Sequence, residues 1–207
     1  PICLRKWVRD GAADELDMPG TIRGTAEKGY LDIQLRPERR NAIKVLIFFD
    51  IGGSMDGHIK LCEELFSAAK TEFKNLEFYY FHNCLYESVW KDNRRRHTEK
   101  LDTWDILNKY GRDYKVIIVG DATMSPYEIQ VCGGSVEHYN SETGAQWLQR
   151  LCATWPALIW LNPSSTNEWD ITPSIGLIQQ IIGKTRMFPL TLAGLSAAMT
   201  VLSQRSV

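Results

Sequence analysis

Two aspartates in this chain each follow directly on an apolar, strand-like run. Val45–Asp56 reads VLIFFDIGGSMD, so the run stops at Asp50 and a small glycine-rich loop with one hydroxyl, Ser54, comes next. Lys115–Gly120 (KVIIVG) leads in the same way to Asp121. In α/β proteins, carboxylates at the ends of parallel strands meet in a crevice at one edge of the sheet, where they can hold Mg²⁺ or a phosphate. The two segments therefore predict a shared site.

A further oxygen ligand is expected from the segment LDTWDIL. Thr103 in this segment is interpreted as the N-cap of a short helix that reaches Tyr110. The chain returns to the same end of the sheet after the preceding strands, so Thr103 can join the aspartates. Simple capping and metal ligation both stay open for Thr103, and ordinary capping of a helix start is the alternative for Asp50 and Ser54.

The elements that must position these residues follow from the periodicity of apolar side chains. Buried strands are expected at residues 44–50, 114–120 and 157–161, and aromatic-rich strands at 76–81 and 85–90 are expected to form a hairpin. Helices are expected at residues 58–73, 103–110, 145–155, 175–182 and 192–202. This alternation predicts an α/β fold, with a Rossmann-like, doubly wound, mainly parallel sheet, one antiparallel edge strand and helices on both faces.

Residues 1–29 of the chain lack a sustained pattern of this kind. Residues 1–42 are expected to form an arm or linker, and residues 43–207 the domain itself. Within the arm, residues 1–29 are expected to be irregular with one short helix, Tyr30–Leu35 to be a half-buried strand, and Arg36–Asn41 to be a polar turn. The chain starts at Pro1 rather than Met, so either the initiator was removed or the chain is a piece of a longer protein, and the family resemblance given below favours the piece.

Composition excludes several classes of protein. The 207 residues are 44% hydrophobic with a net charge of −1, which fits one packed domain and gives no overall attraction to nucleic acid or membranes. The apolar runs are too short to span a bilayer. Five cysteines without CxxC spacing favour free thiols in a reducing cytoplasm over a zinc site or a disulfide framework. The Arg94–Arg96 run is interpreted as a solvated face, with a contact to an acidic partner or nucleic acid as the alternative.

The order and spacing of these motifs resemble the von Willebrand factor A domain and its metal-ion-dependent adhesion site. The family's first motif, D-x-S-x-S after the first strand, corresponds to residues 50–54, which read DIGGS. The family's threonine fits Thr103 best, with Thr98 as a weaker candidate, and its second aspartate fits Asp121. The resemblance covers about residues 43–205, and TIRGT at Thr21–Thr25 resembles the lead-in of the CoxE-like branch.

The resemblance implies a fold like that of the von Willebrand factor A domain and a site for Mg²⁺ or Mn²⁺. The implied ligand positions are Asp50, Gly52, Ser54, Thr103 and Asp121. Gly52 departs from the family pattern because it lacks the serine hydroxyl, so a water would have to take that place. In the family, an Asp or Glu of a protein partner completes the coordination of the metal. A MoxR-type AAA+ ATPase is the associate implied for the CoxE-like branch, in the assembly or activation of protein complexes.

Two enzymatic interpretations compete with this one. A Mg²⁺-dependent phosphohydrolase of the haloacid dehalogenase type also has a strand that ends in Asp, but its chemistry needs a second carboxylate at the position of Gly52. A serine hydrolase needs Gly-x-Ser-x-Gly, and residues 52–56 (GGSMD) lack the last glycine. The sequence therefore predicts binding rather than catalysis.

Overall fold

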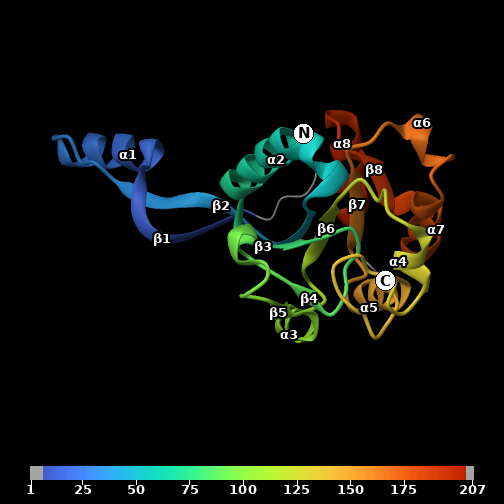
Figure 1. Ribbon diagram of the computed structural model, residues 1–207. Helices are drawn as coiled ribbons and strands as arrows, with labels where there is room; N and C mark the ends of the chain where they lie inside the picture. Colours follow the sequence, from blue (N-terminus) through green and yellow to red (C-terminus); the bar gives the residue numbers. More distant parts are fainter. Residues whose placement is uncertain (1–6, 204–207) are drawn as a thin grey trace.

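The central element is a parallel sheet whose strands are buried on both faces. The computed structural model describes residues 7–203. Its parallel strands lie in the order β3-β2-β6-β7-β8 (Figure 1). Their bounds are β2 (Leu35–Asp50), β3 (Phe73–Phe81), β6 (Lys115–Val119), β7 (Leu158–Asn162) and β8 (Met187–Pro189). The predicted α/β, Rossmann-like fold class is confirmed.

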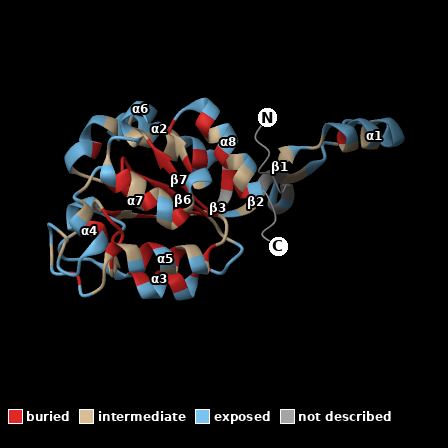
Figure 2. Cartoon of the chain, turned by 90° about the vertical axis from the view of Figure 1, so that its right-hand side faces the viewer, coloured by how far each residue is buried: buried red, intermediate tan, exposed pale blue. Residues whose placement is uncertain are grey.

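Alternate residues of the strands point to opposite faces of the sheet and pack into two separate hydrophobic cores, one on each face. On one face, Val45, Ile47 and Phe49 pack with α2 (Ile59–Glu72) and α8 (Leu192–Ser203). The other core combines side chains such as Phe48 with residues of three further helices, α3 (Thr103–Lys109), α5 (Gly144–Thr154) and α7 (Pro173–Ile182). Buried residues therefore follow the sheet and the inward sides of the helices (Figure 2). This two-sided burial explains why the strands read as continuous apolar runs.

The strand order places a topological switch point between β2 and β6. After β2 the chain crosses through α2 to β3 on one side, and the later strands β6, β7 and β8 add on the other side. Ligands of doubly wound sheets bind at such a point, outside the carboxyl ends of the strands. Short helical segments complete the loops; they are η1 (Gly53–His58), η2 (Asn93–Arg95), α4 (Pro126–Gln130), α6 (Thr166–Trp169) and η3 (Lys184–Arg186).

The predicted hairpin of residues 76–81, which belong to β3, and residues 85–90 takes a different form. A two-stranded antiparallel sheet pairs β4 (Ser88–Val89) with β5 (Leu101–Asp102), and an isolated antiparallel bridge between Tyr80 and Trp90 connects this region to β3. Leu85 and Tyr86 are buried in the core, and the Tyr86 hydroxyl donates a hydrogen bond to the carbonyl of Glu128. Core packing thus replaces strand pairing over the first half of the expected strand.

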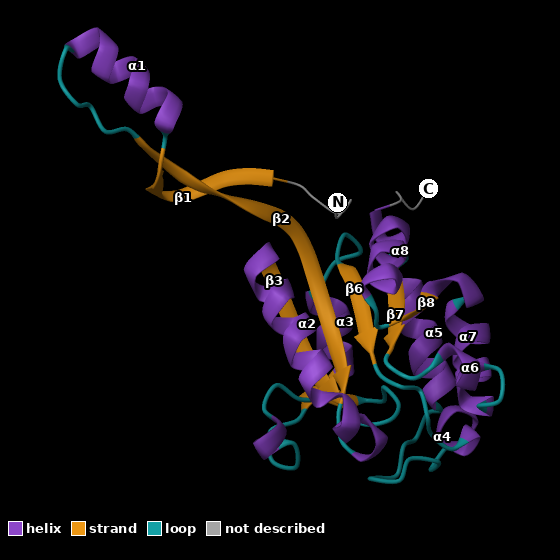
Figure 3. Cartoon of the chain, turned by 90° about the horizontal axis from the view of Figure 1, so that it is seen from above, coloured by secondary structure: helices purple, strands orange, loops and turns teal. Residues whose placement is uncertain are grey.

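An arm extends from the domain at the amino-terminal end of β2. It consists of β1 (Trp7–Leu16), α1 (Met18–Lys28) and the first part of β2, which pairs with β1 in an antiparallel ribbon (Figure 3). The expected polar turn at Arg36–Asn41 was wrong, because the backbone there continues β2 and pairs with β1. The expected strand at Tyr30–Leu35 was also wrong, since only Leu35 belongs to β2. The first six residues of the arm lie outside the described residues.

Within residues 7–203, no helix has both the length and the apolar character needed to cross a bilayer.

Candidate functional site

Asp50 and Asp121 lie at the carboxyl ends of the neighbouring strands β2 and β6. The parallel register pairs Phe49 with Val119, which sets Asp50 beside Gly120, one residue before Asp121. A Cβ atom at Gly120 would lie 2.8 Å from the Cβ of Asp50, so the glycine permits this close approach. Asp50 and Asp121 are only 3% and 4% exposed. Two carboxylates are thus buried at the switch point.

The charge state of Asp50 reflects this crowding. Burial raises the pKa of Asp50 well above its usual range, and the charges of Asp121 and Glu128 raise it further. The backbone N–H of Asn83 donates to Oδ1 of Asp50 at 2.8 Å and acts in the opposite direction, because it stabilises the charged form. On balance these surroundings disfavour the charged form of the Asp50 carboxyl.

Asn83 and Glu128 are two residues of this cluster that the sequence did not single out. Asn83 has a φ of 55°, and its side-chain amide donates to both carboxylate oxygens of Glu128, at 3.1 and 3.2 Å. Glu128 is 2% exposed and completes a capping box with Ser125 at the start of α4. The S-x-x-E spacing of that box was the available sequence signal for Glu128. The role of Asn83 depends on its backbone conformation and left no comparable signal.

The loop after β6 holds Asp121 in a constrained turn. Oδ1 of Asp121 accepts a hydrogen bond from the backbone N–H of Thr123 at 2.9 Å, and its carbonyl accepts one from the Asn162 amide at 2.8 Å. The next residue, Ala122, is buried with a φ of 57°, and its carbonyl accepts a hydrogen bond from the Ser174 hydroxyl at 2.7 Å. A left-handed alanine costs about 1–3 kcal/mol. Contacts from β7 and α7 therefore fix the direction of Asp121.

The glycine-rich loop after β2 is shaped by its backbone. Gly52 and Gly53 have φ values of 91° and 58°, in the region that favours glycine. A Cβ at Gly52 would also lie 3.4 Å from the ring of His82, whose Nδ1 is 2.7 Å from the carbonyl of Ile51. A serine at Gly52 would therefore be strained. Ser54 follows in η1 and is exposed.

Thr103 is buried, but it is not the helix cap that the sequence suggested. Asp102 caps α3 by accepting from the backbone N–H of Trp104 at 2.8 Å, so that prediction was wrong by one residue. Thr103 is fully buried, and its hydroxyl donates a hydrogen bond to the carbonyl of Tyr86 at 2.6 Å. The alternative, Thr98, is exposed and donates to the carbonyl of Arg95 at 3.3 Å.

The side-chain donors of the predicted metal site are two carboxylates, Asp50 and Asp121, and two hydroxyls, Ser54 and Thr103. The structure brings Asp50 and Asp121 together, with Ser54 on the loop that leaves Asp50. Among residues 7–203, no three His, Cys, Asp or Glu side chains form a group that could hold a metal ion. Mg²⁺ accepts one or two carboxylates and keeps several waters, so a site with two aspartates and hydroxyl oxygens suits its chemistry.

No family model, curated protein or solved structure matches this chain. The resemblance to the von Willebrand factor A domain therefore stays a prediction from the sequence motifs.

Proposed function

We propose that this chain is a metal-dependent protein-recognition module. Asp50 and Asp121, together with Ser54 and Thr103, would hold Mg²⁺ or Mn²⁺ at the switch point between β2 and β6. The observation that carries the proposal is the burial of two carboxylates at adjacent strand ends, where the charge of Asp121 acts on Asp50. Buried carboxylates are normally paired or coordinate a metal, because an uncompensated charge is costly to bury.

The proposed residues have separate roles. The two aspartates supply charge, directly or through water, and the hydroxyls of Ser54 and Thr103 supply neutral oxygen ligands. A water would take the position where Gly52 lacks a side chain. Such a site would leave the ion electron-poor, so an Asp or Glu of a protein partner would complete its coordination. The CoxE-like lead-in suggests a MoxR-type AAA+ ATPase as that partner, in the assembly or activation of protein complexes.

The main alternative is a phosphohydrolase of the haloacid dehalogenase type. Its general acid/base carboxylate belongs two residues after the first aspartate, where this chain has Gly52. The positive φ of Gly52 gives that glycine a backbone reason to be there. Both points favour recognition over hydrolysis. The free thiols at Cys62, Cys84, Cys132 and Cys152 fit a reducing compartment such as the cytoplasm.

Thermal melts with added metal test the site. Binding to the folded state raises stability by about 2.7 kcal/mol at a ligand concentration of 100 Kd. The melting temperature of the wild-type protein should rise with MgCl₂ or MnCl₂, and Asp50→Ala should abolish that rise. Glu64→Gln, which removes an exposed charge from α2, should leave it intact. An unchanged wild-type melt, with no binding heat in calorimetry, contradicts the proposal.

Co-purification tests the partner. An AAA+ ATPase should be recovered from native extract in Mg²⁺ and lost in EDTA or with Asp121→Ala, since a desolvated contact between a carboxylate and a metal carries much of the affinity. Retention of the same partner in EDTA would show that docking uses a different surface. Phosphatase turnover that disappears in Asp50→Asn would instead support the hydrolase.

A further inference from the structure

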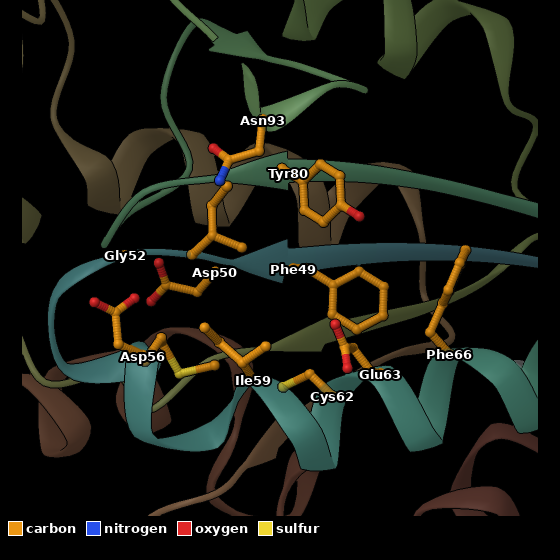
Figure 4. A pocket seen from close by; sticks show the side chains of 12 residues that line it. Phe49, Asp50, Gly52, Asp56, Ile59, Cys62, Glu63, Phe66, Tyr80 and Asn93 are labelled. Carbon is orange, nitrogen blue, oxygen red and sulfur yellow. The ribbon is translucent and has the colours of Figure 1, made fainter. Parts of the chain in front are cut away.

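A pocket of 290 Å³ opens beside Asp50, between α2 and the strands β2 and β3 (Figure 4). Three aromatic rings contribute to its lining, one from each of these elements. The ring of Phe49 lies edge-on to Phe66, with centroids 5.7 Å apart, and is tilted against Tyr80 at 6.1 Å. Ile59 lies between Asp56 and Cys62 along the same side of the pocket and is 52% exposed. The pocket therefore has apolar, aromatic walls and an opening to solvent.

The charged groups of the pocket all have the same sign. Asp50, Asp56 and Glu63 line it, and none of the described lining residues is Lys or Arg. Asp56 and Glu63 are exposed, so they are free to turn toward a ligand at the opening. Arg96 comes near Gly52 at this end, but its guanidinium lies 3.5 Å from the carboxylate of Glu137.

The negative charge around the pocket contributes to raised pKa values of two neutral groups that line it, Tyr80 and Cys62. Burial raises the pKa of Tyr80, and the charges of Asp92 and Glu63 raise it further. Burial also raises the pKa of the Cys62 thiol to about 11, with a contribution from the charge of Asp50. In both groups the nearby carboxylates add to the larger effect of burial. Aromatic walls under a negative field are suited to an organic cation.

We propose that this pocket receives the side chain of an arginine from a protein partner. The volume lies just below the range of about 300–1,000 Å³ usual for small-molecule sites, which favours a single side chain over a cofactor. A guanidinium stacks on aromatic faces and forms paired hydrogen bonds with carboxylates, whereas a compact ammonium does not use both surfaces. Asp50 and Gly52 line the pocket and also belong to the proposed metal site, but Asp56 and Glu63 are not proposed metal ligands, so the assignment of arginine goes beyond that site.

Binding of short peptides tests this assignment. The ¹⁵N-labelled protein is titrated in EDTA with the capped peptide Ac-Gly-Arg-Gly-NH₂ and with its lysine and citrulline counterparts. The arginine peptide should shift backbone signals of residues 59–66 and of Tyr80 in a saturable way. The citrulline peptide, which keeps the shape but not the charge, should bind about tenfold more weakly, and the lysine peptide should also bind more weakly. Equal binding of all three, or no saturable shift with arginine, overturns the proposal.

Variants locate the binding to this pocket. The double variant Asp56→Asn/Glu63→Gln and the filling variant Ile59→Trp should each weaken arginine binding, while Glu64→Gln on the same helix should not. Equal loss in Glu64→Gln, or no loss in the double variant, also overturns the proposal. Metal-dependent melts of the double variant separate the two proposals. A retained metal shift without arginine binding rejects only the pocket, and arginine binding in EDTA without any metal shift rejects only the metal site.

Discussion

The carboxyl edge of the sheet and the amino-terminal arm differ in which side chains they bury: the edge buries carboxylates, and the arm leaves large apolar side chains exposed. At the edge, Asp50, Asp121 and Glu128 are buried and hydrogen-bonded. On the arm, large apolar side chains face solvent; Ile22 is 63% exposed and Leu31 is 70% exposed. A buried polar group needs a partner in a fixed position, but an exposed apolar group imposes no such constraint.

This difference predicts where the molecule tolerates change. The edge combines close backbone contact at Gly120 with left-handed residues at Asn83 and Ala122. Strain of this kind persists only where the surroundings over-determine it, and it gathers at functional sites. The arm is different, because its antiparallel ribbon of β1 and β2 projects away from the helices that cover the sheet (Figure 3). Matched substitutions should therefore have larger effects at the edge.

The largest contrast is expected between two glycine substitutions. In Gly120→Ala, the new Cβ would meet the Cβ of Asp50 at 2.8 Å, close to the backbone, so the strands must move apart. Overpacking of this kind costs about 1–3 kcal/mol. In Gly20→Ala on α1, the new Cβ would lie 2.7 Å from Oδ2 of Asp17, the end of a side chain that can rotate away. Urea unfolding of both variants measures the difference.

The same pair also tests the link between edge geometry and metal binding. Gly120→Ala should reduce the metal-induced rise in melting temperature, because it displaces Asp50 relative to Asp121. Gly20→Ala should keep the full rise. Equal losses of stability in the two variants would contradict the contrast between edge and arm.

A smaller effect is expected from pH in the absence of metal. The pKa of Asp50 is raised in the folded protein by burial and by the charges of Asp121 and Glu128. Such a carboxyl binds its proton more tightly when folded, so the stability it contributes is present at low pH and is lost as pH rises through its folded pKa. In EDTA, Asp50→Asn should therefore be more stable than wild type at neutral pH, and the two should converge toward acid pH.

Urea midpoints of both proteins between pH 5 and 8 measure this difference. Excess Mg²⁺ should reverse it, because the metal stabilises only the protein that keeps the carboxylate. If the wild-type protein in EDTA instead becomes more stable than Asp50→Asn as the pH rises, the charged form of Asp50 is not disfavoured in the folded protein.

The sequence predicted most of the domain, because burial leaves a pattern there. The apolar run before Asp50 and the helical spacing over residues 58–73 correspond to β2 and α2 in the structure. The polar segment Arg36–Asn41 has no alternation of apolar and polar residues, yet it belongs to the ribbon that β2 forms with β1. Backbone pairing with β1 extends the strand there, and pairing between distant segments cannot be read from local periodicity.

The candidate site was predictable to the extent that topology determines it. Parallel strands that end in Asp50 and Asp121 must present them at one edge, and the switch point between β2 and β6 brings them together. The conformation of the residues between elements was not predictable in the same way. The left-handed backbone of Asn83 and the one-residue shift of the α3 cap from Thr103 to Asp102 both depend on tertiary contacts.

The smallest effect is expected from an ion-pair cluster on the arm. The Arg36 guanidinium lies 3.0 Å from Glu15 and 3.3 Å from Asp17, and all three side chains are about one-third exposed. The bonds from Arg36 and Arg9 lower the pKa of Glu15, so its contribution to stability is present at neutral pH and is lost as pH falls, opposite in sign to that of Asp50. Exposed pairs are screened by salt and contribute little to stability.

Arg36→Ala should lower the melting temperature by less than about 2 °C at low salt and by still less in 1 M NaCl. Thermal melts at both salt concentrations measure this. A larger loss that persists in high salt would mean that the arm is integral to the fold, and that the edge of the sheet is not the more constrained region.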